Sequence, residues 1–247
     1  MLVKSQVKYI QSLSQKKVRD EEGVFIVEGP KIINELLAAP STELSQLFVT
    51  KEWIGRQDNL LKEMDKQKIF LVSQDELIRI SALITPNEAV AIFKKPVFEN
   101  PQSPEGRISL LLDGLQDPGN LGTIIRSADW FGISQVYCTE DCADVYSSKV
   151  VQATMGSISR VQVEYVDART FLNRHKGLTL YAATLGGNSI YKMKKISEGI
   201  IAIGNESKGI RSSILDMASH KITIPGKGFA DSLNASVAAG ILLSHLT

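Results

Sequence analysis

Apolar residues before residue 95 fall into short runs that alternate between two spacings. Compact β-branched and aromatic runs bounded by polar residues predict strands at 24–27, 47–50, 69–72 and 90–93. Between them, apolar positions recur every three or four residues, as at Val7, Ile10 and Leu13. They predict helices at 4–14, 32–37, 59–66 and 74–84, the last opened by Ser73. This alternation predicts a small α/β unit with its own sheet.

The segment 96–107 breaks this pattern, because it contains three prolines, one glycine and little that can pack. A second series follows, with strands predicted at 108–113, 135–138, 159–163, 178–184 and 199–203, and helices at 120–131, 145–154, 168–175 and 212–218. The runs ISLLLD and GIIAIG are almost wholly apolar, which is typical of a parallel sheet covered on both faces. We therefore expect a domain at 1–95, a linker at 96–107 and a second α/β domain at 108–247.

The last stretch of the chain has an unusual helix start. A β-branched run at 222–224 stops at Pro225, and the chain restarts as a helix that is small or apolar on nearly every face. We expect Asp231 or Ser232 to cap this buried helix, while Ser232 and Asn234 place polar groups where free backbone N–H groups collect. Two interpretations stay open, a ligand site and an ordinary capped core helix.

Composition limits the class of protein. Of the 247 residues, 43% are hydrophobic, no apolar run approaches the length of a membrane span, and the N-terminus lacks the apolar core of a signal peptide. We expect a cytoplasmic protein with no membrane partner. Cys138 and Cys142 are the only cysteines and the three histidines are scattered, so we expect free thiols and no metal.

The charge distribution says more than the net charge of +1, which neither requires nor excludes a nucleic-acid partner. Before residue 20 there are five basic residues and no acidic one, and we take Lys16, Lys17 and Arg19 as candidate RNA contacts. The alternative is a solvated helix face followed by an exposed loop.

Three loops that follow predicted strands combine glycine with polar residues, at 113–122, 204–209 and 225–234. In open α/β sheets ligands bind beyond the carboxyl ends of strands, so these loops are expected to form one site. Each loop taken alone is also compatible with a simple turn. The chain has no dinucleotide-binding glycine motif, P-loop, nucleophile elbow or zinc-protease motif, which leaves those readings without support.

The residues of these loops carry a family resemblance. The segments at 112–133, 201–210 and 222–240 read LDGLQDPGNLGTIIRSADWFGI, IAIGNESKGI and ITIPGKGFADSLNASVAAG. In order and spacing they resemble the three motifs of the SpoU, or TrmH-like, RNA 2′-O-ribose methyltransferases of the SPOUT superfamily. The segment SLSQKKVRDEEGVFIVEGPKII is similar to the ribosomal L30e-like RNA-binding domain that precedes the catalytic domain in many members.

The resemblance implies a deep trefoil knot in the second domain, S-adenosylmethionine as cofactor, RNA as substrate and a homodimer. It places the cofactor pocket on Thr184, Leu185, Gly186, Gly204, Asn205, Glu206, Ile224, Gly226, Ser232 and Leu233. It places the catalytic positions on Asn120, Arg126, Glu206, Ser232 and Asn234. These assignments agree with physical chemistry. Glycine-containing turns offer backbone groups to an adenine, and a permanently charged arginine can bind a phosphate beside the reacting ribose.

Competing interpretations remain for single residues and for the whole chain. Taken alone, Arg126 is also an ordinary surface arginine, Glu206 a turn carboxylate and Asn120 a helix cap. For the chain, the main alternative is a non-catalytic RNA-binding protein that keeps the knotted fold, and a further one is an α/β enzyme acting on a small metabolite. The sequence does not decide between ribosomal and transfer RNA.

Overall fold

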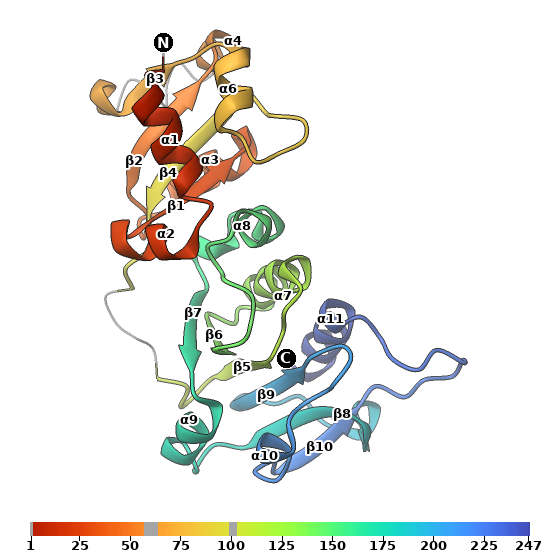
Figure 1. Cartoon of the computed structure of the whole chain (residues 1–247). Coiled ribbons are helices and arrows are strands. Elements are labelled where there is room, and N and C mark those ends of the chain that lie inside the picture. Colours follow the sequence, from red (N-terminus) through yellow and green to blue (C-terminus); the bar gives the residue numbers. More distant parts are fainter. Residues whose placement is uncertain (1, 57–63, 99–102) are drawn as a thin grey trace. The chain divides into compact units, whose positions relative to one another are not determined.

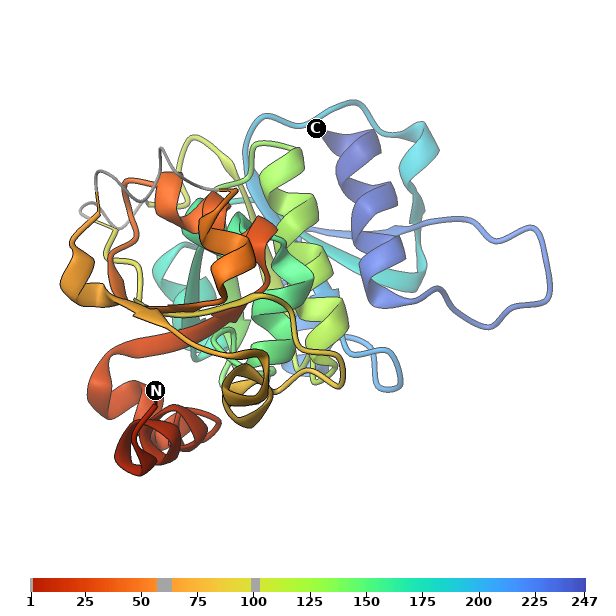
Figure 2. The same ribbon diagram turned by 90° about the horizontal axis from the view of Figure 1, so that it is seen from above.

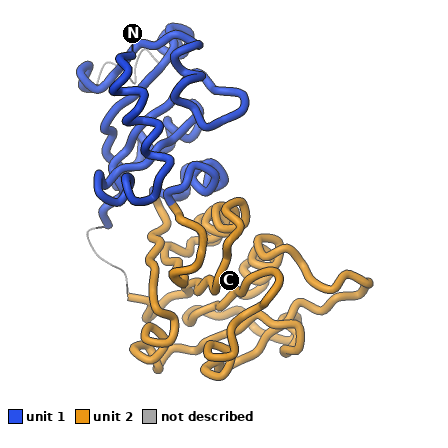
Figure 3. The backbone as a smooth tube through the Cα atoms, viewed as in Figure 1, with its two compact units in different colours: residues 1–98, 146–159 blue, residues 99–145, 160–247 orange. Residues whose placement is uncertain are grey.

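The structure is a computed structural model that describes residues 2–56, 64–98 and 103–247, and the chain divides into two compact units (Figures 1 and 3). The first unit comprises the chain up to Phe98 together with Tyr146–Ser159, and the second comprises Glu99–Val145 and Arg160–Thr247. The chain thus passes between units within the expected linker and twice more, at 145/146 and 159/160. In the described part of the chain no helix has the length and apolarity needed to span a membrane.

The first unit is a four-stranded mixed sheet with helices, as the alternating pattern predicted. Its strands run in the order β1-β4-β2-β3, and only the β2–β3 pair is parallel. The elements up to residue 98 are α1 (Lys4–Ser12), α2 (Lys16–Glu22), β1 (Val24–Glu28), α3 (Pro30–Ala38), β2 (Leu44–Val49), α4 (Lys51–Ile54), η1 (Lys66–Lys68), β3 (Ile69–Leu71), α6 (Gln74–Ile80) and β4 (Ala89–Lys94). The helix predicted at 59–66 lies mostly outside the described residues.

Local capping sets the start of α6 as predicted. The Ser73 side chain accepts from Glu76 N–H, and the Glu76 carboxylate accepts in return from Ser73 N–H, which is a reciprocal capping box. The helix ends at Ile80, earlier than the predicted 84, because Ser81 already adopts an extended conformation.

The segment Tyr146–Ser159 packs within the first unit although it follows the start of the second in sequence. It contains α8 (Ser148–Thr154) and η2 (Ser157–Ser159). The Tyr146 ring lies 5.1 Å from the Phe25 ring, and Gln152 Nε2 donates to the Glu28 carbonyl at 2.7 Å. At Gly156 φ is +97°, and a Cβ there would lie 2.8 Å from Glu35 Cβ, so glycine is needed for this approach. These contacts hold the segment against β1 and α3 of the first unit.

The second unit is an all-parallel six-stranded sheet in the order β10-β8-β9-β5-β6-β7, which confirms the predicted parallel α/β class. Its elements are β5 (Ile108–Asp113), α7 (Pro118–Trp130), β6 (Gln135–Thr139), β7 (Gln162–Val166), α9 (Ala168–Arg174), β8 (Leu180–Ser189), η3 (Ile190–Lys192), β9 (Gly199–Gly204), α10 (Ser212–Leu215), β10 (His220–Thr223) and α11 (Ala235–Leu246). The threading of the terminal helix through a knot stays a prediction from the resemblance.

Helices cover both faces of this sheet (Figures 1 and 2). On one face, Phe171 of α9 and Ile214 of α10 join Leu111 and Ile200 of the central strands in one buried cluster. On the other face, α7 packs against α11. Because both faces are covered, the central strands β5 and β9 are almost wholly apolar, as the sequence pattern indicated.

Several predicted bounds differ from those observed. The strand predicted at 159–163 lies at Gln162–Val166, because Ser157–Ser159 forms a 3₁₀ turn, and the strand predicted at 178–184 continues to Ser189. The expected cap of the terminal helix is also wrong. Asn234, not Asp231 or Ser232, is the N-cap, and its Oδ1 accepts from Ser236 N–H at 3.0 Å.

Candidate cofactor and catalytic site

The carboxyl ends of β5, β8, β9 and β10 lie at one edge of the sheet, because these four strands are adjacent and run parallel to one another. The three glycine-containing loops singled out in the sequence all leave strands at this edge. It is where ligands bind in open α/β sheets.

A bulge interrupts the pairing of β8 with β10. Lys221 is paired with Ala182, but the next residue, Ile222, is paired with Asn188, so residues 183–187 have no partner on β10. This bulge contains Thr184, Leu185 and Gly186 of the expected cofactor set. Gly187 closes it, since a Cβ there would lie 2.5 Å from Ile222 N. The bulge therefore holds a run of backbone groups away from the ladder at the ligand-binding edge.

A tight turn follows β9. Asn205 and Gly209 form a two-residue bridge, and a Cβ on Gly204 would lie 2.2 Å from the Gly209 carbonyl carbon. Glycine at 204 is therefore required for the return of the chain. Asn205 Oδ1 accepts from the Ser207 and Lys208 N–H groups inside the turn.

Three of the five expected catalytic residues meet in a hydrogen-bonded chain. Asn120 Nδ2 donates to Glu206 Oε1 at 2.5 Å, and Asn234 Nδ2 donates to Asn120 Oδ1 at 2.9 Å. They come from α7, the turn after β9 and the start of α11. Asn120 is not the cap of α7, because Asp117 performs that role and accepts from Asn120 N–H at 2.7 Å. The side chain of Asn120 is thus available for the link between the three motifs.

The other expected site residues lie apart from this chain. All residues from Pro225 to Asn234 are exposed, and the loop extends away from the rest of its unit (Figures 1 and 2). It carries Gly226, Ser232 and Leu233, while Ile224 at its base is half-buried. Arg126 is exposed on α7, and its side chain forms no hydrogen bond or ion pair with any of the described residues.

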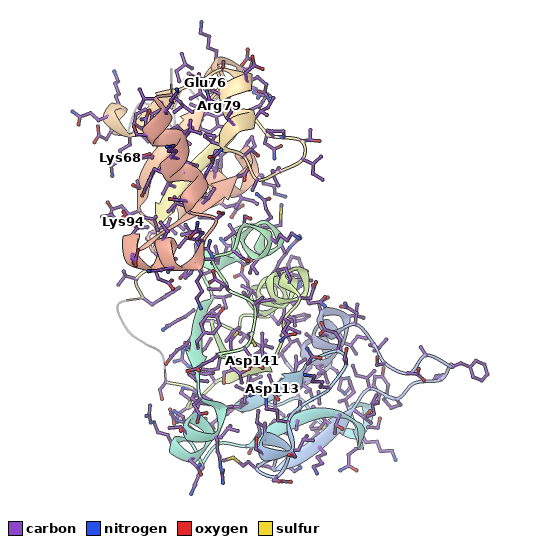
Figure 4. The ribbon with its side chains drawn as sticks, viewed as in Figure 1. Lys68, Glu76, Arg79, Lys94, Asp113 and Asp141 are labelled. Atoms are coloured by element: carbon purple, nitrogen blue, oxygen red, sulfur yellow. The ribbon has the colours of Figure 1, made fainter. Side chains whose placement is uncertain are left out.

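Sequence reasoning missed an ion-pair network beside this site. Arg211 lies between the buried Asp113 at the end of β5 and Asp141 after β6, and Figure 4 labels both carboxylates. Arg211 Nε is 2.8 Å from Asp113 Oδ1, and Arg211 Nη2 is 2.6 Å from Asp141 Oδ1. The only sequence signal was an acidic residue at each of two strand ends.

The two cysteines flank the same edge as free thiols. Cys142 accepts from Leu115 N–H at 3.2 Å, and the hydrogen bond from Cys138 lowers the pKa of Cys142 to about 7. The same hydrogen bond and burial raise the pKa of Cys138 well above its usual value. Across the described residues, no group of three or more histidines, cysteines and carboxylates is arranged to hold a metal ion.

The candidate RNA contacts in the first unit divide into two kinds. Lys16 and Lys17 are exposed on α2. Arg19 is only 4% exposed, and its Nη1 donates to the carbonyls of Leu13 and Ser14 at 2.7 and 2.8 Å. The expectation for Arg19 is therefore corrected, because its guanidinium fastens the turn between α1 and α2 instead of facing solvent.

Comparison with known proteins agrees with this geometry. Residues 107–244 match the model of the SpoU rRNA Methylase family, and residues 4–91 match the MRM3-like substrate binding domain. The 23S rRNA (guanosine(2553)-2′-O)-methyltransferase RlmP of Bacillus subtilis is 29% identical over 97% of this chain and 95% of its own.

Solved structures give the same result. A TrmH-family protein from Porphyromonas gingivalis is 35% identical, with a TM-score of 0.84 over 100% of this chain and 98% of its own. An AdoMet-bound rRNA methyltransferase from Sinorhizobium meliloti is 29% identical, with a TM-score of 0.84 over 100% and 95% of the two chains.

An all-parallel sheet with a bulged ligand edge and a polar chain linking three motifs defines a ligand-binding α/β enzyme. The family model matches residues 107–244, which is more than half of the chain, and this shows that the chain belongs to the SpoU rRNA methylase family. It is accordingly an RNA methyltransferase that uses S-adenosylmethionine, as the three motifs predicted.

The residues at the edge fit this cofactor. The backbone of the bulge at 183–187 has no ladder partner on β10, and nothing lies within 4 Å of a Cβ placed on Gly186 or Gly226, so both positions leave open space. An adenine is recognised by such backbone N–H and C=O groups at close approach.

Proposed function

We propose that this chain transfers a methyl group to a ribose 2′-hydroxyl of ribosomal RNA. The observation that carries the proposal is the chain of hydrogen bonds through Glu206, Asn120 and Asn234, which joins the three motifs at the ligand edge of the sheet. The Bacillus subtilis relative, named for 2′-O methylation of a guanosine in 23S rRNA, supports ribosomal over transfer RNA as the substrate.

The cofactor residues fall into two groups in this proposal. Thr184, Leu185 and Gly186 on the bulge, with Gly204, Asn205 and Glu206 at the turn, form the fixed wall of the pocket. The loop 225–234 folds back to add Gly226, Ser232 and Leu233, with Ile224 as an apolar base. When bound, S-adenosylmethionine supplies a methyl group activated on a sulfonium.

The protein's own side chains then act on the RNA. The 2′-oxygen must lie in line with the methyl group, and positioning of this kind supplies a large share of the rate. Arg126 binds the phosphate next to the reacting ribose and stabilises negative charge on the 2′-oxygen as its proton passes to solvent water. Ser232 and Asn234 hold the ribose, while Glu206 fixes the turn through Asn120.

The first unit captures the RNA in this proposal. Its match to a substrate-binding domain and the exposed Lys16 and Lys17 support that role. An L30e-like domain at 1–95 would then act through phosphate and shape contacts, with the linker at 96–107 leading to the catalytic domain at 108–247.

Methylation is favoured over the alternative of a non-catalytic RNA-binding protein, because the polar chain is complete and the relatives are methyltransferases. The test is a methyl-incorporation assay on 23S rRNA with wild type and Arg126→Ala, alongside calorimetric titration of S-adenosylhomocysteine. We expect Arg126→Ala to bind the cofactor product normally and to lose methyl transfer. Near wild-type methylation by the variant would remove Arg126 from the mechanism, and an inactive wild type would favour the non-catalytic alternative.

We also propose a homodimer, with no metal, working in the cytoplasm. The support is apolar surface on the second unit, where Trp130 at the end of α7 is 85% exposed and Val237 on α11 is 49% exposed. Light scattering should give twice the 27.1 kDa mass of the chain. A constant monomer mass across micromolar concentrations would refute the dimer.

A further inference from the structure

Arg211 stands where the turn after β9 returns toward the sheet, and two kinds of contact hold it to Asp113. Its backbone N–H donates to Asp113 Oδ2 at 2.7 Å, and its Nε lies 2.8 Å from Oδ1. Within the described chain Oδ1 accepts no aligned hydrogen bond, so the second contact is an ion pair. The return limb of the turn is therefore fastened to the last residue of β5.

The outgoing limb of the same turn is fastened to Gly114, the residue that follows Asp113. Asn205 Nδ2 donates to the Gly114 carbonyl at 2.9 Å. Both limbs are thus anchored to the consecutive residues Asp113 and Gly114. Glu206 lies between the two anchors, and its carboxylate is the group that accepts from Asn120.

The end of β6 joins the same network. Thr139 Oγ1 accepts from Gly114 N–H at 2.8 Å and donates to Asp141 Oδ1 at 2.7 Å, while Asp141 pairs with Arg211. Gly114 has a φ of +64°, and a Cβ there would lie 3.2 Å from Asp141 Oδ2. Three strand ends are therefore held in register around one guanidinium.

The charged groups of this network are expected to add little to stability. Asp113 is 1% exposed, and burial raises its pKa although Arg211 opposes the shift. Because the folded pKa lies above the unfolded one, ionised Asp113 costs stability at neutral pH, and this cost shrinks as the pH falls below the raised pKa and is gone below the unfolded pKa. The side chains of Arg211 and Asp141 are 48% and 51% exposed, and pairs of that exposure contribute little to stability.

We propose that Asp113 and Arg211 are positioning residues, which fix the turn after β9 so that Glu206 meets Asn120 and the backbone of Gly204 and Asn205 stays in place for the cofactor. This inference rests on the proposed function. Neither side chain needs to contact a substrate, since both act through the turn.

The test uses the intact protein with Arg211→Ala, Arg211→Lys and Asp113→Asn. Arg160→Ala is the matched control, because Arg160 also forms an ion pair in the second unit, with Asp129 at 2.9 Å, and its side chain is 43% exposed. Three quantities are measured for each protein: the affinity for S-adenosylhomocysteine by calorimetry, kcat and KM for methylation of 23S rRNA, and the melting temperature.

We expect Arg211→Ala to bind S-adenosylhomocysteine about 10-fold more weakly and to lower kcat roughly 100-fold, with little change in KM for RNA. A displacement of about 1 Å at a reacting centre can lower the rate by that factor. Arg211→Lys should recover part of the loss, since lysine keeps the charge but cannot span both carboxylates as a planar fork. Asp113→Asn should lower kcat while its melting temperature stays equal or rises. Arg160→Ala should match wild type in binding and kcat.

The inference is overturned if Arg211→Ala binds S-adenosylhomocysteine as wild type does. It is also overturned if kcat falls only in proportion to melting temperature across all variants, which would indicate a purely structural role. If Arg211→Ala does not fold, Asp113→Asn decides by the same two criteria. A wild type that binds the product but methylates no RNA counts against the proposed function alone, because the binding measurements still test the positioning role.

Discussion

Replacement of Asn120 by alanine tests the central hydrogen-bonded link with little disturbance of the fold. The variant loses the Asn120 bond to Glu206, at 2.5 Å, and the bond from Asn234, at 2.9 Å. The cap of α7 survives, because Asp117 accepts from the backbone of residue 120 and not from its side chain. Alanine is also a better helix former than asparagine.

The expected magnitude follows from the hydrogen bond to the Glu206 carboxylate. Bonds of this charge-assisted kind contribute about 1.5–3 kcal/mol. If the link is needed to reach the transition state, its loss lowers kcat/KM by roughly 10- to 100-fold, since about 1.4 kcal/mol corresponds to a factor of ten. The melting temperature should stay within about 3 °C of wild type, because both partners remain accessible to water.

The assay is methyl incorporation into 23S rRNA at several RNA concentrations, with melting followed by circular dichroism. Thr123→Ala is the control, because Thr123 lies on the same helix, is exposed, and donates only to the Gly119 carbonyl of its own helix among the described residues. It should behave as wild type. If Asn120→Ala keeps kcat/KM within about threefold of wild type, the link between the motifs has no role in catalysis and the reasoning fails.

Three further outcomes are expected. Replacing Lys16 and Lys17 together with alanine should weaken RNA binding and reduce the slope of log affinity against log salt by about 1.5, since fewer counterions are released. An unchanged salt slope in a titration series would refute this role of the two lysines. Arg19→Ala should lower the melting temperature instead. Alkylation of Cys142 by iodoacetamide should accelerate as the pH rises through about 7, because the thiolate is the nucleophile, with Cys142→Ser unreactive; a rate that is flat between pH 6 and 8 in mass spectrometry would contradict this. In a fragment of residues 1–98, the amide hydrogens of β1 should exchange with solvent roughly 30-fold faster than in the intact chain. The reason is that the Tyr146 ring and the Gln152 hydrogen bond, which together contribute about 2 kcal/mol, are missing. Equal exchange rates in the fragment and the intact chain, measured by mass spectrometry, would refute this prediction.

The sequence was sufficient where local patterns decide the structure. Apolar runs located β5 and β9, the serine at 73 opened its helix, and the motifs identified Asn120, Glu206 and Asn234, which do meet in space. These features depend on neighbouring residues or on the family resemblance.

Features that depend on distant contacts were not predictable in the same way. Arg19 has the same sequence surroundings as Lys17, and only the carbonyls of the preceding turn decide that it is buried. The bulge in β8 arises from its pairing with β10, some forty residues later in the chain, and glycine at 187 gave no indication of the partner. Likewise, no periodicity in Tyr146–Ser159 indicates that it packs on β1.

The segment Tyr146–Ser159 sets the order in which the protein is completed on the ribosome. Domains usually fold as units while the chain is made, at about 5–20 residues per second. The first unit must wait for the 61 residues from Glu99 to Ser159, a delay of roughly 3 to 12 seconds at those rates. By the end of that interval β5 and β6 have been synthesised, while β9, the second neighbour of β5, has not. The nascent chain therefore carries a first unit that still lacks α8 and a second sheet that still lacks strands, and an exposed strand edge such as that of β5 is what chaperones protect from aggregation.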